Sequence, residues 1–354
     1  MKATSSMQAS LSRRVGMGAL LLGGALALSG PPAASGATFQ ELVAAAQKEG
    51  RLTIYSSESA AQVKASAKDF QERYGIQVEA TRLVSGTLTS RYAAERAAGK
   101  VVADVISLSA EPFYTDNPDW WLKLDEKTIP NIKDYPPSAI NKDGIFVTVA
   151  QQGMVIAYNT DLIPAKDAPK SYEDLLDPRF SAPGTIVIAN PRATQSGMSF
   201  FWVMIEKLGP DYYKKLMKQQ PAIAEGAGPA AQLVGAGANA VAIGTFANHA
   251  QGVITAGAPV KYVYPPAPST GTDNQLAISA RAPHPNAARL FVAYRLTREA
   301  HEVLCKVGGS ASPLGAIRGC EPPAPADYIP TNYKVWNDRA WQQKYLPLLG
   351  LKPL

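Results

Sequence analysis

The sequence predicts an α/β protein built from two lobes, and three observations carry this prediction. Apolar, β-branched segments alternate with segments of helical periodicity, which is typical of a mostly parallel sheet with helices on its faces. Glycine stands where such helices should end, as at Gly50 and Gly75. After Pro164 and Pro169 a new set of strands and helices begins, which indicates a second lobe.

The elements of the first part form three strand–helix units in a row, which favours parallel strands joined by right-handed crossovers. In order, the pattern predicts a helix over 39–49, a strand over 51–55, a helix ending near 74, a strand over 77–80, a helix over 85–98 and a strand over 103–107.

The later elements imply two strands that cross between the lobes. They are a strand over 145–158, a helix over 171–176, a strand over 185–189, helices over 199–208 and 212–218, strands over 240–243 and 261–264, and a strand followed by a helix between 275 and 304. We interpret 145–158 and 261–264 as the crossing strands. Lobe one is therefore expected at 38–150 plus 265–325 and lobe two at 151–264, with 326–354 as a C-terminal helical segment that packs on a lobe.

Residues 1–37 have the layout of a bacterial export signal. Lys2, Arg13 and Arg14 precede an apolar run, and small residues follow it as a cleavage site. The alternatives are a retained membrane anchor or a disordered tail, but the run is short and rich in Gly and Ala for a membrane span. Because Gly16 follows the arginine pair, both the Sec and the twin-arginine routes stay open. We expect an exported protein.

The composition argues against a nucleic-acid partner. The formal charge of +6 falls to +3 when the three basic residues of 1–37 are removed, since that segment holds no acid. So small an excess of positive charge is not typical of nucleic-acid binders. No later segment has 18 consecutive apolar residues, so we expect a soluble body, and we expect it to be a monomer.

Only two cysteines are present, Cys305 and Cys320. In an oxidising compartment such an isolated pair most simply forms one disulfide, and two free thiols are the alternative. A loop of this size would stabilise the fold by roughly 3 kcal/mol through the unfolded state.

Three loops that precede helices share Ser, Thr and Gly, and they are the candidate ligand site. The unpaired N–H groups of a helix N-terminus favour an oxyanion, and glycine lets a ligand approach closely. Ordinary N-capping is the alternative for each loop. The candidate residues are Ser57, Ser85, Gly86, Thr87, Thr194, Ser196 and Gly197.

Arg192 is the cation that the sequence favours for an anionic ligand, because it follows a buried strand and leads into the Ser196–Gly197 helix start. A surface ion pair is the alternative for Arg192. Thr245, Phe246 and Asn248 follow another strand and are expected at the same cleft, although Phe246 could equally belong to the core.

No residue pattern indicates a metal site, a cofactor or an enzyme. The three histidines, His249, His284 and His301, stand on separate elements without ligand spacing. The Gly-x-Ser-x-Gly, His-Glu-x-x-His and P-loop motifs are missing from the sequence. We therefore expect no catalytic residue, no metal and no cofactor.

In their order along the chain, several motifs resemble those of periplasmic solute-binding proteins of ABC importers, in the ferric-ion-binding-like branch of the type II fold. These motifs are residues 52–57, 85–87, 153–161 (GMVIAYNTD), 171–180 (SYEDLLDPRF), 190–197 (NPRATQSG) and 310–313. The resemblance implies a Venus-flytrap fold with two hinge strands, a small solute and an inner-membrane permease as partners, and delivery of the solute to that permease.

One departure from the branch decides the expected ligand. The ferric-binding members of this branch resemble one another in having two adjacent tyrosines that ligate iron. At the corresponding place this chain has residues 245–248 (TFAN). We therefore expect a small organic anion, such as a phosphonate, sugar phosphate or carboxylate. The alternatives are a ferric-ion binding protein, an exported hydrolase that would use His249, and a sensor subunit with the same fold.

Overall fold

A computed structural model describes residues 38–354, so the predicted export signal lies outside the described residues. The helices are α1 (Phe39–Glu49), α2 (Ala60–Tyr74), α3 (Ser85–Ala97), α4 (Glu111–Thr115), α5 (Gln195–Leu208), α6 (Pro210–Met217), α7 (Ala227–Gly235), α8 (Ala247–Thr255), α9 (Pro285–Arg295), α10 (Arg298–Cys305) and α11 (Arg339–Tyr345). The strands are β1 (Arg51–Ser56), β2 (Gln77–Arg82), β3 (Val105–Leu108), β4 (Val147–Asn159), β5 (Ile186–Ala189), β6 (Ala222–Ala224), β7 (Val241–Phe246), β8 (Val260–Val263), β9 (Thr270–Ile278) and β10 (Ile329–Pro330).

The strands form one sheet in the order β2-β1-β3-β9-β4-β7-β5-β6, with β10 beside β9 and β8 beside β4. β1 pairs in parallel with β2 and β3, and β5 pairs in parallel with β6 and β7. The two parallel groups are joined through β4 and β9, which pair with each other in antiparallel fashion. The α/β class predicted from the sequence is therefore confirmed.

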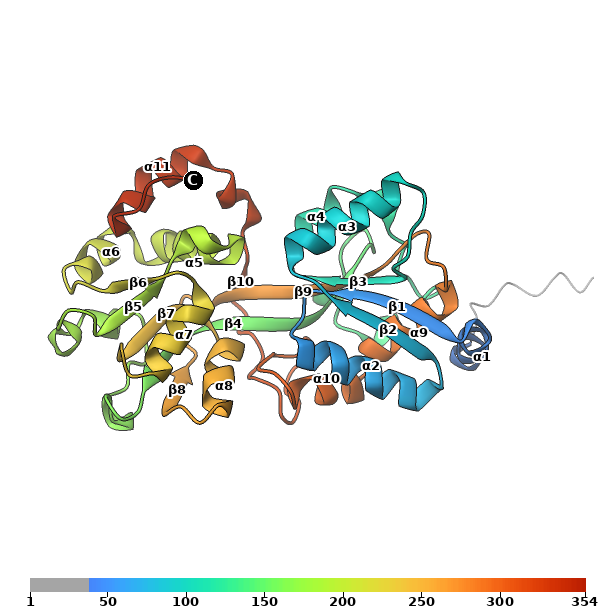
Figure 1. Cartoon of the computed structure of the whole chain (residues 1–354), viewed down its shortest axis with the longest axis horizontal. Helices are drawn as coiled ribbons and strands as arrows, with labels where there is room; N and C mark the ends of the chain where they lie inside the picture. Colours follow the sequence, from blue (N-terminus) through green and yellow to red (C-terminus); the bar gives the residue numbers. More distant parts are fainter. Residues whose placement is uncertain (1–37) are drawn as a thin grey trace, which may run out of the picture. The chain divides into compact units, whose positions relative to one another are not determined.

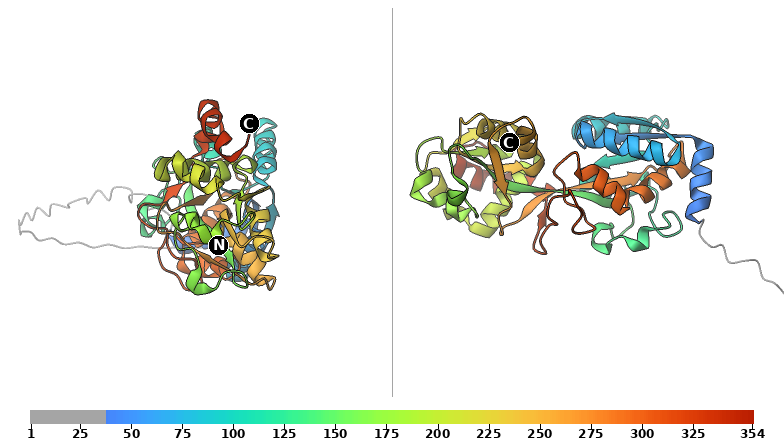
Figure 2. Two further views of the ribbon diagram at one scale, coloured as in Figure 1. Left: turned by 90° about the vertical axis from the view of Figure 1, so that its left-hand side faces the viewer. Right: turned by 90° about the horizontal axis from the view of Figure 1, so that it is seen from below.

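Helices and strands gather into two groups that β4 and β9 connect (Figures 1 and 2). We call the elements around β1, β2 and β3 the first lobe, and those around β5, β6 and β7 the second lobe. Separate apolar cores lie in each, one centred on residues such as Phe70 and Phe291, the other on Phe201 and Tyr213. β4 contributes Val147 to the first core and Ile156 to the second, so a single strand runs through both.

The second crossing strand differs from the sequence prediction. Residues 261–264 were expected to cross, but β8 pairs with the far half of β4, at Ile156–Asn159, within the second lobe. β9 crosses instead, pairing with β4 from Gly271 to Leu276 and with β3 from Gln275 to Ile278. The reason is compositional, because the first half of β9 is rich in Thr, Asp and Asn and therefore lacks the apolar signature of a buried strand.

The C-terminal residues pack on the second lobe. Val335, Leu346 and Leu349 are part of its core, and Trp341 stacks edge-on against Phe201 at 5.5 Å between ring centroids. α11 accordingly lies beside α5 and α6 (Figure 1). Among residues 38–354, no helix is both long enough and apolar enough to cross a membrane.

Candidate functional site

A cavity of about 810 Å³ lies between the lobes, lined by residues of both. Most of them stand at carboxyl ends of strands, where open α/β sheets bind ligands. The lining residues are Ser57, Glu58, Ser59, Ala61, Gln62, Arg82, Val84, Ser85, Ser109, Ala110, Gln152, Thr194, Gln195, Ser196, Phe246, Asn248, His249, Gln251, Gly252, Thr255, Thr272, Asn274, Val307, Gly308 and Tyr333.

Of the residues that the sequence singled out, one group lines this cavity and another does not. Those on the lining are Ser57, Ser85, Thr194, Ser196, Phe246 and Asn248, which come from both lobes. Those off the lining are Gly86, Thr87, Arg192, Gly197 and Thr245.

Two of the residues off the lining are engaged in local structure. The Thr245 side chain is fully buried, and its hydroxyl donates to the carbonyl of Ala227 over 2.7 Å. The N–H of Gly197 donates to Thr194 Oγ1 over 3.0 Å, so Thr194 is the N-cap of α5. For the loop before α5, the observed contacts are therefore those of ordinary N-capping, the alternative to a ligand site.

Arg192 does not take part in the lining, although the sequence favoured it as the ligand's cation. Its backbone N–H donates to Asn190 Oδ1, in a short 3₁₀ turn over Pro191–Ala193. Its Nε is buried and has no hydrogen-bond partner within residues 38–354.

Arg82 is the cation of the lining, and it is not among the site residues predicted from the sequence. It ends β2, and its Nε donates to the carbonyl oxygen of Glu58 over 3.4 Å. The signal was present, because Arg82 stands three residues before Ser85 at the end of a strand. The predicted strand ends at residue 80, so Arg82 belongs neither to it nor to the predicted site loop that begins at Ser85.

Glu58 is the one acidic residue of the lining, and its charge is already matched. Arg295 of α9 reaches it with two hydrogen bonds, Nη2 to Oε1 over 3.0 Å and Nη1 to Oε2 over 3.3 Å. Both side chains are almost completely buried, at 1% and 4% exposure. Ser107 Oγ lies 3.2 Å from Glu58 Oε2 and 2.7 Å from Asn274 Oδ1, so the wall of the first lobe is a connected polar network.

Two helices begin at the cavity without a capping side chain. α3 begins after Val84 and α8 after Phe246, and neither residue accepts a bond from the first turn through its side chain. No N-cap side chain therefore satisfies their N-terminal N–H groups, and the partial positive charge of each helix end lies at the cavity. α2, by contrast, is closed by the Ser59–Gln62 capping box.

His249 brings an imidazole to the second-lobe wall. Its ring packs edge-on against Phe246 at 5.7 Å, and its Nδ1 is buried without a partner in the described part of the chain. Burial lowers the pKa of His249 from its ordinary value, because the charged form loses its hydration. The imidazole is therefore neutral near pH 7 and offers one donor and one acceptor.

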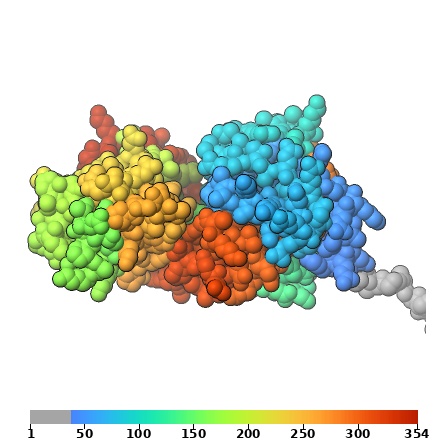
Figure 3. Space-filling model, turned by 60° about the horizontal axis from the view of Figure 1, so that its bottom comes forward, coloured from blue at the N-terminus to red at the C-terminus, as the bar shows by residue number. Residues whose placement is uncertain are grey.

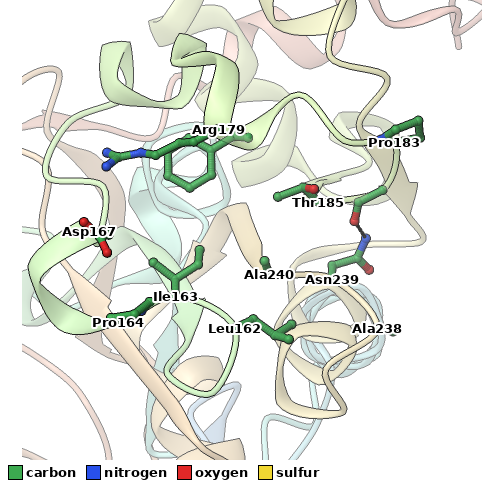
Figure 4. A pocket seen from close by; sticks show the side chains of 12 residues that line it. Leu162, Ile163, Pro164, Asp167, Arg179, Pro183, Thr185, Ala238, Asn239 and Ala240 are labelled. Atoms are coloured by element: carbon green, nitrogen blue, oxygen red, sulfur yellow. Dashed lines mark hydrogen bonds between the residues drawn. The ribbon is translucent and has the colours of Figure 1, made fainter.

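A second cavity, of about 500 Å³, lies at the other end of the second lobe, beside the amino ends of β5 and β7 (Figure 4). Ile163, Phe180 and Ala240 give it an apolar floor, and Asn239 at its edge donates to the carbonyl of Gly184. Since ligands of open α/β sheets bind at the carboxyl ends, we take the cavity between the lobes as the candidate site.

Comparison with known proteins gives a family match and structural likenesses. A family described as "Bacterial extracellular solute-binding protein" matches residues 52–308. No curated protein sequence matches the chain significantly.

Three solved structures illustrate the likeness in fold. Iron-bound HitA from Pseudomonas aeruginosa is 23% identical with a TM-score of 0.60, over 79% of this chain and 90% of HitA. AfuA from Actinobacillus pleuropneumoniae, with exogenous fructose-6-phosphate bound, is 21% identical with a TM-score of 0.59, over 86% and 99%. The substrate-binding protein of an Agrobacterium tumefaciens ABC transporter is 16% identical with a TM-score of 0.67, over 84% and 95%.

Proposed function

This chain belongs to the bacterial extracellular solute-binding protein family, and we therefore propose that it is the periplasmic receptor of an ABC importer. The resemblance noted in the sequence is confirmed by the family match and by the shared fold. In our proposal the receptor captures a small organic anion between its lobes and delivers it to an inner-membrane permease. It is a binding protein rather than an enzyme in this account.

The charge balance of the cavity between the lobes is the observation that supports an anionic ligand. The acidic side chain of its lining, Glu58, is neutralised by Arg295, whereas Arg82 forms no ion pair within residues 38–354. The uncapped N-termini of α3 and α8 add two partial positive charges, one from each lobe. An anion that contacts both helices favours the closed arrangement, because only that arrangement offers all the contacts.

The ligand residues in this proposal come from both walls of the cavity. Arg82 takes the role that the sequence analysis gave to Arg192, because Arg82 is the arginine that lines the cavity. Gly86 and Thr87 contribute through their backbone N–H groups at the start of α3. The side-chain contacts are assigned to Ser57, Ser85, Thr194, Ser196, Phe246 and Asn248.

A ferric ion fits the cavity less well than an anion. Iron-bound HitA shares the fold, but residues 245–248 of this chain hold no tyrosine, and the cavity lining contains a single one, Tyr333. Within residues 38–354, no three His, Cys, Asp or Glu side chains are grouped as a metal site would need. Tight Fe³⁺ binding with a charge-transfer colour would favour the ferric alternative.

The hydrolase alternative would rely on His249. The residue does line the cavity, yet no hydrogen bond joins it to a nucleophilic side chain within the described residues. General-base catalysis requires that contact or one through water. Turnover that is lost in a His249→Ala variant would support the alternative.

Calorimetry on protein that has been unfolded, freed of ligand and refolded tests the proposal. The panel contains phosphonates, sugar phosphates and carboxylates. We expect one of them to bind, and Arg82→Gln to weaken binding about 10- to 100-fold, the usual effect of losing a charge-assisted hydrogen bond. Arg192→Gln is the matched control and should bind within about twofold of the unchanged protein.

Equal losses in the two arginine variants would contradict the assignment of Arg82 but not the anion. A greater loss in Arg192→Gln would return the role to Arg192. Failure of every anion on the panel would overturn the proposed ligand class.

A further inference from the structure

The loop between the two cysteines contacts both lobes, a feature that the sequence does not predict. The Cys305–Cys320 disulfide is present and closes residues 305–320 into a loop. Cys305 ends α10, and residues of that helix, including Ala300, belong to the first-lobe core. The orange-red part of the chain that contains this loop fills the space between the lobes in the space-filling view (Figure 3).

On the first-lobe side the loop is bonded to α2 at the edge of the cavity. Gln62 Nε2 donates to the carbonyl of Gly308 and to Ser310 Oγ, each over 3.1 Å. Gln62 and Gly308 both line the cavity. The loop is therefore fixed to the wall that carries Ser57 and Glu58.

The middle of the loop pairs with β4, one of the two crossing strands. Ala311 and Gln151 of β4 exchange two backbone hydrogen bonds, of 3.0 Å and 2.8 Å. Glu321, the residue after Cys320, donates its N–H to the carbonyl of Ser310 over 3.1 Å. Ser310 and Ala311 therefore lie beside Glu321, next to the crossing strand β4.

On the second-lobe side the carboxylate of Glu321 accepts two phenol hydrogen bonds. Tyr262 donates to Oε1 over 2.7 Å and Tyr264 to Oε2 over 3.0 Å. Both tyrosines pack against the β7–α8 side of the second lobe. Burial and the neighbouring carboxylate raise the pKa of both phenols, so they remain protonated donors at all ordinary pH values.

A close backbone approach adds a further contact with the second lobe. A Cβ on Gly309 would lie 3.0 Å from the N and Cα atoms of Asn248, and Gly309 has a φ of +24°. Only glycine lets the loop lie against the first turn of α8 in this way. The loop thus contacts the helix N-terminus that faces the cavity.

We propose that residues 305–321, of which 305–320 are closed by the disulfide, are a strap that holds the two lobes in the arrangement described here. The strap connects α2, β4, β8 and the start of α8, so it limits how far the lobes rotate about the crossing strands. Opening the disulfide, or removing the phenol–carboxylate bonds, releases the second lobe and broadens the range of lobe arrangements. The proposal concerns the ligand-free protein and does not depend on which solute is bound.

The test measures inter-lobe distances in the ligand-free protein by pulsed electron resonance. Spin labels are placed at Lys68→Cys on α2 and Lys214→Cys on α6, whose side chains are 69% and 58% exposed. The strap variants are Tyr262→Phe/Tyr264→Phe, which keeps the ring volumes and the disulfide, and Cys305→Ser/Cys320→Ser. The matched control is Tyr212→Phe, which removes a buried phenol bond to the carbonyl of Tyr172 inside the second lobe.

We expect a broader or shifted distance distribution in both strap variants and an unchanged one in the control. The two changes combined should have little more effect than either alone, because they act on one element. An unchanged distribution in the folded Tyr262→Phe/Tyr264→Phe variant would overturn the strap, and this variant decides the question if the serine variant does not fold. Since no ligand is added, the outcome is separate from that of the anion proposal.

Discussion

At the scale of single residues, the cavity depends on an ion pair whose partners are 237 residues apart in the chain. Glu58 lies in the loop between β1 and α2, and Arg295 is the last residue of α9. Taking both charges out of water is costly, and their attraction and hydrogen bonds offset that cost only while both are present. Arg295 therefore affects the site indirectly. Its positive charge balances the Glu58 carboxylate, which would otherwise repel an anionic ligand.

Removing only one member of this pair should be severe. We expect Arg295→Met to lower the free energy of unfolding by about 3–5 kcal/mol, because it leaves the Glu58 carboxylate buried without a partner. Denaturant unfolding measures this change. Glu58→Gln added to Arg295→Met should restore more than half of the loss.

A surface arginine provides the control for this prediction. Arg179 lies 4.0 Å from Asp177, and both side chains are exposed to solvent. Arg179→Met should therefore change stability by less than about 1 kcal/mol. Equal effects in the two arginine variants would mean that the buried pair contributes no more than a surface one.

Residues that follow predicted strands could be placed from the sequence, whereas those brought in by the tertiary fold could not. Ser57, Ser85 and Asn248 were predicted because strand ends of a parallel sheet converge at one edge. Arg295 was not, because no local pattern links it to Glu58. Tyr333 was missed for the same reason, since it arrives at the cavity from the C-terminal segment.

At the scale of elements, helix α9 depends on α1 for its N-terminal cap. Its own N-cap, His284, makes no capping bond with its side chain. Glu49, at the end of α1, accepts from the N–H groups of Asn286 and Ala287 over 3.1 Å and 2.8 Å. A carboxylate at this position also complements the helix dipole.

Glu49→Ala should lower the free energy of unfolding by about 1–2 kcal/mol, the usual cost of losing a charged cap. Thermal or denaturant unfolding detects this change. Glu72→Ala is the control, because Glu72 is 64% exposed and only approaches Lys68 at 3.7 Å. A loss of similar size in the control would assign the effect to surface charge rather than to capping.

Elements with strong periodicity or a terminal glycine were predictable, and polar or very short ones were not. The helix predicted over 39–49 coincides with α1, which ends at Gly50. The next predicted helix ends at Gly75, as α2 does in the structure. The predicted helix over 171–176 is only a 3₁₀ turn, Glu173–Leu176, which is too short to be distinguished by periodicity. β9 escaped prediction as the crossing strand because its cavity-facing half is polar.

At the scale of the whole molecule, the second lobe is completed by the end of the chain. Removing residues 333–354 takes Val335, Leu346 and Leu349 out of its core and should expose the faces of α5 and α6. We expect hydrogen exchange to accelerate throughout β5 and β7, with much smaller changes in β1 and β3, whose core holds none of these residues. Equal acceleration in both lobes would show that they unfold as a single unit.

The position of these last residues also bears on how the protein reaches its compartment. The first core draws on residues as late as Ala300, and the second on Leu349. A polypeptide that threads through a translocation pore with its N-terminus leading therefore cannot complete either core until nearly all of it has passed. During passage of that kind, each lobe acquires its complete core only near the end, so the emerging chain stays incompletely folded until then.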